Sequence, residues 1–251
     1  AVSGVQAKDQ DRVETVIYRK DAQKAIIRYV STNGNRVLTT DEVTGKSGEA
    51  IAYSTTSQIT EFKKQGYNLV SDEFTSGGAK VYDYDTARDQ VYTVTLSERV
   101  EPVNPDNPTP QPNTPVNPGQ PDSPRWPGTV ENLDNKESVS RTIHYVYEDG
   151  SKAKDDVVET LNFKRWSNVN LVTGHIDFQD WTTNDDTFDK VVSPTIAGYT
   201  ADKSEIPAVS GVQAKDQDRV ETVTYRKDAQ KAVIRYVSTN GNRVLTTDEV
   251  T

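Results

Sequence analysis

The stretch KAIIRYVSTNGNRVLTTDEV, residues Lys24–Val43, reads as two strands joined by a tight turn. Ala25–Val30 is rich in the β-branched and aromatic residues that favour a strand. Asn33 and Gly34 form a strong turn signal because both tolerate positive φ. Arg36–Val43 then returns as the second strand. The stretch therefore predicts a β-hairpin that opens a small domain.

This hairpin occurs twice in the chain. Ala1–Thr44 returns as Ala208–Thr251, an offset of 207 residues (208 minus 1). Only two of the 44 positions differ, Ile17 against Thr224 and Ile26 against Val233. A period of 207 is too long for a solenoid unit of about 20–50 residues. Each period therefore holds one or two whole domains, and further copies are expected outside this chain.

A helix is expected after the first hairpin. Thr55 and Gln58 have the spacing of a capping box, Ile59 and Phe62 share one face, and Gly66 is a natural stop.

Two further strands complete a first domain over residues 22–100. Tyr67–Val70 begins one strand, and Val91–Leu96 alternates between two faces. The resulting order, two strands, a helix and further strands, is that of a β-grasp fold.

Residues 101–135 are expected to form a linker. Ten of the twelve prolines lie between Glu101 and Gly128, many at every third position. This spacing matches the turn of a polyproline II helix, so we expect a semi-rigid spacer up to about 80 Å long. A ligand for a proline-recognition domain is the alternative, although basic flanking residues are missing.

A second, diverged β-grasp domain is expected over residues 136–228. It repeats the Tyr-Val-x-x-Asn/Asp-Gly pattern of the first hairpin, with Asp149 and Gly150 at the turn. Trp166–Val192 has no helical period, so four or five strands with little helix are expected. Val220–Tyr225 alternates as the closing strand.

The two ends are expected to be severed parts of neighbouring domains. Residues 1–21 copy the closing segment of a preceding repeat domain, and residues 229–251 copy the opening hairpin of the next. An isolated hairpin is marginal in water. We therefore expect the ends to be mobile or to pair in trans, including by domain exchange.

Composition excludes several functional classes. The net charge of −9 disfavours nucleic acid and anionic membranes as partners. No apolar run is long enough to insert in a bilayer, and the absence of cysteine excludes disulfides and thiol catalysis. The two histidines, His144 and His175, lie without a nucleophile motif. The sequence therefore predicts a protein that is not an enzyme.

An acidic loop is a weak candidate for a calcium site. Asp83, Asp85 and Asp89 offer oxygen ligands, but the glycine and glutamate of an EF-hand loop are missing. A solvated loop without any cofactor is the simpler interpretation.

Aromatic residues beside polar ones are the candidates for sugar binding, because a ring face can cover the apolar face of a sugar. Trp166 and Trp181 lie in the irregular middle of the second domain, near Asn168 and Asn184. Tyr82 and Tyr84, beside the acidic loop, are weaker candidates. The competing interpretation is that a domain with so few large apolar residues needs its tryptophans for packing.

The chain resembles the Mub repeat of lactobacillus mucus-binding proteins, in the mucin-binding domain family of cell-surface adhesins. The segments that carry the resemblance are KAIIRYVSTNGN (Lys24–Asn35), GYNLVSD (Gly66–Asp72), TIHYVYEDG (Thr142–Gly150), DWT (Asp180–Thr182) and SPTIAGYTAD (Ser193–Asp202). The resemblance implies two ubiquitin-like β-grasp domains per repeat, within a large extracellular adhesin anchored to the cell wall of a Gram-positive gut bacterium.

Two functions follow as hypotheses. The first is an adhesin repeat that binds mucin glycans weakly, with strength from many neighbouring repeats. The resemblance also implies immunoglobulin as a partner of some repeats, and an open sheet edge could pair with an immunoglobulin strand. The alternative is a structural stalk that presents a distal binding domain.

Overall fold

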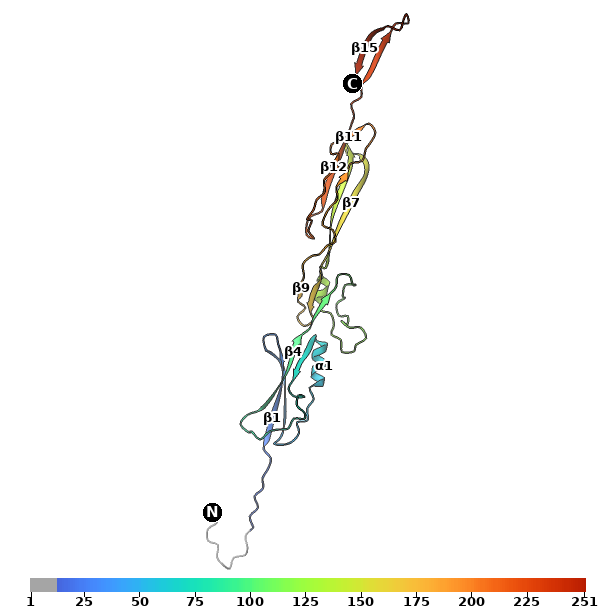
Figure 1. The fold of residues 1–251 in the computed structure, drawn as a ribbon. Helices are drawn as coiled ribbons and strands as arrows, with labels where there is room; N and C mark the ends of the chain where they lie inside the picture. Colours follow the sequence, from blue (N-terminus) through green and yellow to red (C-terminus); the bar gives the residue numbers. More distant parts are fainter. Residues whose placement is uncertain (1–12) are drawn as a thin grey trace, which may run out of the picture. The chain divides into compact units, whose positions relative to one another are not determined.

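The structure, a computed structural model, describes residues 13–251, which divide into two compact units (Figure 1). Unit 1 holds the described residues up to Pro102, with Pro110–Asn132 and Asn168–Ile176. Unit 2 holds Val103–Thr109, Leu133–Ser167 and Asp177–Thr251. Strands dominate both units, and α1 is the one α-helix among the described residues. The prediction of a strand-rich chain with little helix is confirmed.

Unit 1 is built on a four-stranded sheet in the order β2-β1-β4-β3. The strands are β1 (Ala22–Ser31), β2 (Arg36–Lys46), β3 (Tyr67–Asp72) and β4 (Gln90–Glu98), and β1 runs parallel to β4. Alternate side chains of β1, namely Ala25, Ile27 and Tyr29, are fully buried. This period of two places them on the core face of the sheet.

The helix of unit 1, α1 (Thr56–Lys64), buries Ile59 and Phe62 as predicted and is followed by Gly66 at φ +94°. The predicted capping box is wrong, because Thr55 makes no side-chain cap hydrogen bond. Its hydroxyl instead donates to Asp72 Oδ2 at 2.6 Å. The helix start is therefore fixed by a contact with β3, which propensity cannot reveal.

The hairpin turn differs in detail from its prediction. The positive φ values fall on Gly34 and Asn35, at 70° and 52°, one position later than the expected pair. Pairing of Ser31 with Arg36 leaves a four-residue loop between the strands.

The proline-rich segment corrects the prediction of an extended polyproline II spacer. Backbone N–H groups of Asn113, Val116 and Trp126 donate to carbonyl groups across a hairpin-like loop, at 2.9–3.0 Å. Proline lacks the donor but keeps the acceptor, and the carbonyl of Pro124 accepts one of these bonds. The residues between the prolines supply the donors that fold the segment back on itself.

Unit 2 has a second four-stranded sheet, in the order β11-β13-β6-β7. The strands are β6 (Lys136–Tyr147), β7 (Lys152–Lys164), β11 (Tyr199–Ala201) and β13 (Arg219–Lys227), with β13 parallel to β6. The closing strand predicted over Val220–Tyr225 is thus confirmed. Short elements also occur outside the two four-stranded sheets. They are β5 (Val100–Val103), η1 (Gly128–Asn132), β8 (Ser167–Asn170), β9 (Ile176–Phe178), β10 (Val191–Val192) and β12 (Glu205–Ile206).

Arg141 lies on β6 between Val139 and Ile143, which belong to two separate apolar clusters of unit 2. Only 1% of this residue is exposed. The guanidinium donates to Glu159, to the carbonyl of Asp189 and, at 2.9 Å, to the carbonyl of Pro207. The buried charge is therefore hydrogen-bonded on several sides, as a low-dielectric site requires.

The second copy of the hairpin forms β14 (Ala232–Val237) and β15 (Val244–Val250), which pair only with each other. Ile234 and Tyr236 are 46% and 47% exposed, although their counterparts Ile27 and Tyr29 are completely buried. Residues 13–20 are exposed and have no regular secondary structure. The rest of the predicted N-terminal segment lies outside the described residues, and pairing of either end in trans remains a prediction.

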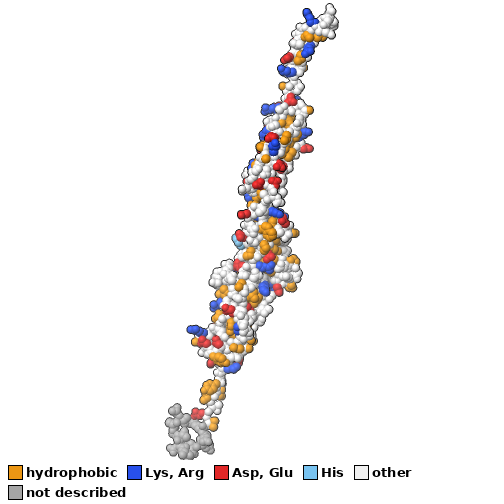
Figure 2. Space-filling view, viewed as in Figure 1, with side chains coloured by type: hydrophobic (Ala, Val, Ile, Leu, Met, Phe, Trp, Pro, Cys, Tyr) orange, Lys and Arg blue, Asp and Glu red, His pale blue; other side chains and the backbone are white. Residues whose placement is uncertain are grey.

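Two surface features bear on partners. On the face drawn in Figure 2, acidic and basic side chains are interspersed. The negative net charge is therefore not gathered into one patch on that face. Within residues 13–251, no helix has both the length and the apolar character needed to cross a bilayer.

Candidate functional site

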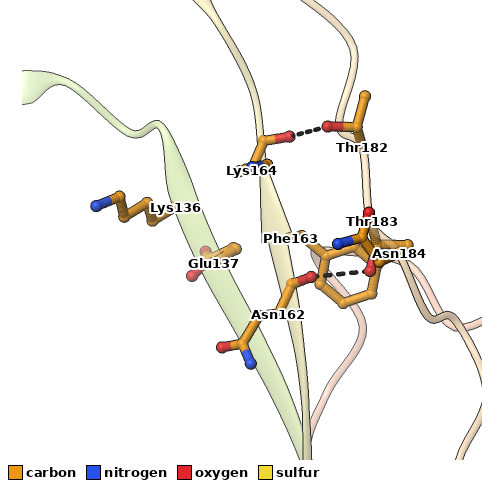
Figure 3. Close-up of a pocket in the computed structure, with 8 residues that line it drawn as sticks. All are labelled: Lys136, Glu137, Asn162, Phe163, Lys164, Thr182, Thr183 and Asn184. Atoms are coloured by element: carbon orange, nitrogen blue, oxygen red, sulfur yellow. Dashed lines mark hydrogen bonds between the residues drawn. The ribbon is translucent and has the colours of Figure 1, made fainter. Parts of the chain in front are cut away.

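Unit 2 carries a pocket of about 280 Å³ between the start of β6 and the end of β7 (Figure 3). We call it the strand-edge pocket, and it is lined by Lys136, Glu137, Asn162, Phe163, Lys164, Thr182, Thr183 and Asn184. The hydroxyls of Thr182 and Thr183 donate to the carbonyls of Lys164 and Asn162, at 2.9 and 2.8 Å. These bonds fasten the loop after Trp181 to the edge of β7.

A second pocket of about 480 Å³ shares Phe163 and Thr183 with the first. We call it the Trp181 pocket. Phe163, Val212 and Ala214 are buried residues of one apolar cluster, and Trp181 packs against this cluster. Polar side chains complete the lining: Asp180, Asp186, Gln213, Lys215 and Asp216. An aromatic and aliphatic floor with a polar rim is the usual composition of a ligand site.

Cations stack on the Trp181 indole. The Arg165 guanidinium carbon lies 4.3 Å from the Trp181 ring centre and 4.0 Å from that of Phe178. Lys215 Nζ lies 5.4 Å from the same indole. Arg165 also donates to the backbone and carboxylate oxygens of Asp134, at 2.8 and 3.0 Å. Trp181 is therefore held by its neighbours, and less of its ring is available to a sugar.

Lys215 is fixed by two carboxylates. Its ammonium donates to Glu137 Oε1 and to Asp134 Oδ2 at 2.5 and 3.0 Å. The hydrogen bond to Glu137, followed by that to Asp134, raises the pKa of Lys215. Lys215 on the rim of the Trp181 pocket is thus protonated at neutral pH, and the carboxylates of Glu137 and Asp134 compensate its charge.

The predicted sugar-binding residues do not form one cluster. Trp181 lines its own pocket and Asn184 lines the strand-edge pocket beside it. Trp166 is 43% exposed but lines neither of these pockets, and Asn168 lies half-buried in β8. Of the predicted residues, Trp181 and Asn184 line adjoining pockets, and sugar binding by them stays a prediction.

The tyrosine candidates of unit 1 are separated by burial. Tyr82 is buried with its ring directly over Gly45, where an added Cβ would lie 2.1 Å from a ring carbon. That ring is committed to packing, which corrects the prediction of a sugar contact. Tyr84 is 79% exposed and its hydroxyl lies near Gly48. Tyr84 alone of the two has a free surface.

The acidic loop does not gather its carboxylates. Asp83 and Asp85 each accept a backbone N–H two residues further on, at 3.1 and 2.9 Å. Asp89 pairs instead with Lys24 at 2.9 Å. Among the described residues no group of three acidic or histidine side chains has the arrangement of a metal site. The weak calcium prediction is therefore corrected, because local turns and an ion pair use the oxygens.

The histidines lie on exposed surfaces. His144 Nδ1 lies 2.9 Å from Asp156 Oδ2 across β6 and β7, and His175 follows Gly174 in an exposed turn. Both lie outside the strand-edge pocket and the Trp181 pocket.

Sequence reasoning missed one aromatic residue. Trp126 lies in the proline-rich segment, which was expected to be an extended spacer, yet it lines a groove in unit 1. The available signal was a lone tryptophan within a segment otherwise rich in proline and polar residues.

Two family models match successive parts of the chain. Residues 23–98 match the model of a mucin binding domain, and residues 130–229 match that of the Muc B2-like domain. The chain is similar to the crystal structure of Mub-RV, at 26% identity and a TM-score of 0.65. It is also similar to the type 2 repeat of the mucus binding protein MUB from Lactobacillus reuteri, at 27% identity and a TM-score of 0.53.

Each of these two likenesses covers 82% of this chain and 100% of the other. The MucBP domain of the adhesion protein from Pediococcus pentosaceus is 35% identical over 37% of this chain and 99% of that domain, with a TM-score of 0.33. Comparison with curated proteins gives no match. Two family models placed in tandem, with whole-repeat structural likeness, confirm the resemblance found in the sequence: the chain is a Mub-like mucin-binding repeat.

Proposed function

We propose that the chain is a non-catalytic repeat of a bacterial surface adhesin that binds host mucin glycans. The observation that carries this proposal is the match of residues 23–98 to a mucin binding domain, followed in the same chain by the Muc B2-like match. The two pockets of unit 2 have aromatic residues in their lining, and rim lysines such as Lys164 and Lys215 are paired with carboxylates. Such surfaces suit weak sugar contacts rather than chemistry.

The proposal includes two β-grasp domains, over residues 22–100 and 136–228. The two sheets support this view because their orders correspond strand by strand. β2-β1-β4-β3 in unit 1 matches β7-β6-β13-β11 in unit 2, and a parallel central pair occurs in both. The helix of the first is replaced in the second by irregular chain and short strands.

Within unit 2 we assign sugar contact to the rim that joins the two pockets. Asn184 supplies an exposed amide, Thr183 lies on both pockets, and Asp186 and Gln213 offer acceptors and donors. Trp181 supports this rim from beneath, held by Arg165. A single pocket of this kind gives weak affinity, and repetition raises avidity by about 10²–10⁴.

A binding assay on immobilised mucin tests the proposal. The chain and a tandem of two full periods are compared, and the tandem is expected to bind at least about tenfold more tightly through avidity. Asn184→Ala should weaken both, whereas Tyr18→Ala, which removes an exposed aromatic side chain outside both pockets, should change neither. Negligible binding by chain and tandem alike would refute the adhesin proposal.

The same experiment separates the alternative function, a structural stalk. A stalk repeat binds no mucin at any number of copies. Removing copies of it changes only the distance at which the distal binding domain is presented. Immunoglobulin binding is a further proposal, and it would use the edge strands β2 or β7, which end their sheets. We place the protein outside the cell, because mucin is extracellular, and the likeness to Mub repeats supports the surface of a Gram-positive cell with a wall anchor.

A further inference from the structure

We propose that unit 1 contains a second carbohydrate site, in which the Trp126 indole stacks on a neutral hexopyranose. This inference rests on the proposed function, since it names a further place where the repeat holds glycan. The site is a groove of about 680 Å³ between the end of α1 and the folded proline-rich loop. We call it the Trp126 groove.

The proline-rich loop is held in a fixed form by backbone hydrogen bonds. Asn113 N–H donates to the carbonyl of Trp126 at 2.9 Å, and Trp126 N–H donates to that of Thr114 at 3.0 Å. Asn113 takes a φ of 60°, which asparagine tolerates better than most residues. The backbone that bears the indole is therefore fixed by two hydrogen bonds across the loop and is not an extended spacer.

The opposite wall of the groove is fixed as well. Gly66, at the end of α1, lies so close to Leu171 that an added Cβ would sit 2.8 Å from the Leu171 Cβ. Leu171 N–H donates to the carbonyl of Arg99 at 2.9 Å, and Arg99 N–H donates to that of Gly66 at 2.8 Å. Leu171 and the helix end thus form one apolar side of the groove.

The Trp126 ring differs from that of Trp181 in its contacts. Trp181 has Arg165 and Lys215 on its indole. Among the described residues, no aromatic ring or cation makes such a contact with Trp126, and it belongs to none of the three core clusters. A half-buried indole that lines a groove is suited to the C–H face of a sugar ring.

Most polar side chains that line the groove are uncharged. Gln65, Asn113, Gln120 and Ser123 line the groove. An amide offers both donor and acceptor, which matches pairs of neighbouring sugar hydroxyls. The ligand class is therefore one with many hydroxyls and one apolar face.

The cations of the groove are already engaged, which favours a neutral ligand. Lys64 Nζ lies 2.9 Å from Glu61 and 3.8 Å from Asp122. The Arg125 guanidinium donates to the carbonyl of Asn113. The charge of Lys64 is therefore compensated by carboxylates, and part of the Arg125 guanidinium is used within the loop.

The test uses the three indole N–H signals of the whole chain in a ¹⁵N-tryptophan spectrum, each assigned by a single Trp→Phe variant. Methyl β-D-galactopyranoside and methyl N-acetyl-β-D-glucosaminide are titrated, with galactitol as an acyclic control. The Trp126 signal should shift saturably with a cyclic sugar and not with galactitol. Trp126→Ala should weaken binding at least about tenfold, Trp126→Phe should retain part of it, and Trp166→Ala should leave it unchanged.

Variant folding is checked by amide exchange in β4, and Gln120→Ala, which leaves the indole in place, should also weaken binding. The proposal is overturned if only the Trp166 or Trp181 signal shifts, or if galactitol shifts the Trp126 signal as the cyclic sugars do. It is also overturned if the Trp126 signal shifts with an added proline-rich peptide and with neither sugar. Failure is distinguishable from that of the adhesin function. If the unsubstituted chain binds mucin but the Trp126 signal does not shift with sugar, only the Trp126 site is refuted. If the Trp126 signal shifts but the chain does not bind mucin, only the adhesin function is refuted.

Discussion

The duplicated hairpin allows one substitution to be made twice in nearly identical sequence. Ile27→Ala and Ile234→Ala remove the same three carbon atoms from equivalent positions. Ile27 has no exposed surface and belongs to the core cluster of unit 1, whereas Ile234 is 46% exposed. We therefore expect very different free energies of unfolding from two changes that local sequence cannot distinguish.

The magnitude follows from burial. Ile27→Ala loses the transfer free energy of three buried carbon atoms, about 0.8 kcal/mol each, and leaves a cavity beneath α1. Substitutions of this kind cost about 2–5 kcal/mol. Ile234 packs only against its own hairpin, so its replacement should cost less than about 1 kcal/mol and should leave unit 1 untouched.

Amide hydrogen exchange measured on the peptide Gln90–Glu98 isolates unit 1, because β4 occurs once in the sequence. Ile27→Ala should accelerate exchange of β4 by at least about thirtyfold, the equivalent of about 2 kcal/mol. Ile234→Ala should leave that exchange unchanged. Equal effects of the two variants, or a loss above about 2 kcal/mol at Ile234, would refute the assignment of burial to the two copies.

Three further predictions concern stability. Arg141→Ala should lower the unfolding free energy of unit 2 by about 3–5 kcal/mol, because it leaves Glu159 and two carbonyls without their donor; Lys152→Ala, at an exposed ion pair, should change it by less than about 1 kcal/mol in the same urea titration, and similar losses would contradict the buried role. Burial, followed by hydrogen bonds, raises the pKa of Tyr53, and burial also raises that of Tyr29. Both tyrosines therefore ionise at a lower pH in the unfolded chain than in the folded one. Their contribution to stability is fully present below about pH 10 and falls as the pH rises. Tyr53→Phe should flatten this alkaline loss by up to about 1.4 kcal/mol per pH unit, and an unchanged slope would count against it. Gly66→Ala should destabilise unit 1 by about 1–3 kcal/mol in thermal unfolding, because its φ of +94° and the nearby Leu171 both exclude a Cβ; a neutral result would show that the close approach relaxes freely.

Much of the fold could be read from local patterns. β-Branched and aromatic residues located β1, and alternation located β4 and β13. Glycine positions located the helix end at Gly66 and the turn near Gly34. These features depend only on a residue and its close neighbours in sequence. Strand side chains alternate with a period of two, and glycine tolerates positive φ. The family resemblance rested on the same local motifs and is confirmed.

The candidate site was less predictable, because pockets depend on residues far apart in sequence. Trp181 and Lys215 meet over one pocket, and Trp126 faces a groove completed by Gln65 and Leu171. The proline period of three indicated an extended spacer, but donors between the prolines closed it into a loop. Proline spacing limits the backbone angles and does not fix the direction of the chain.

The sequence by itself determined the repeat, the strands with their turns, and the family. Tertiary structure alone decided which faces are buried, and the hairpin copies demonstrate this directly. Tyr29 is fully buried while Tyr236, in the same local sequence, is half exposed. The physical reason is that local sequence fixes backbone conformation, whereas burial requires a partner: β4 and α1 cover the first copy, and β14 and β15 have only each other.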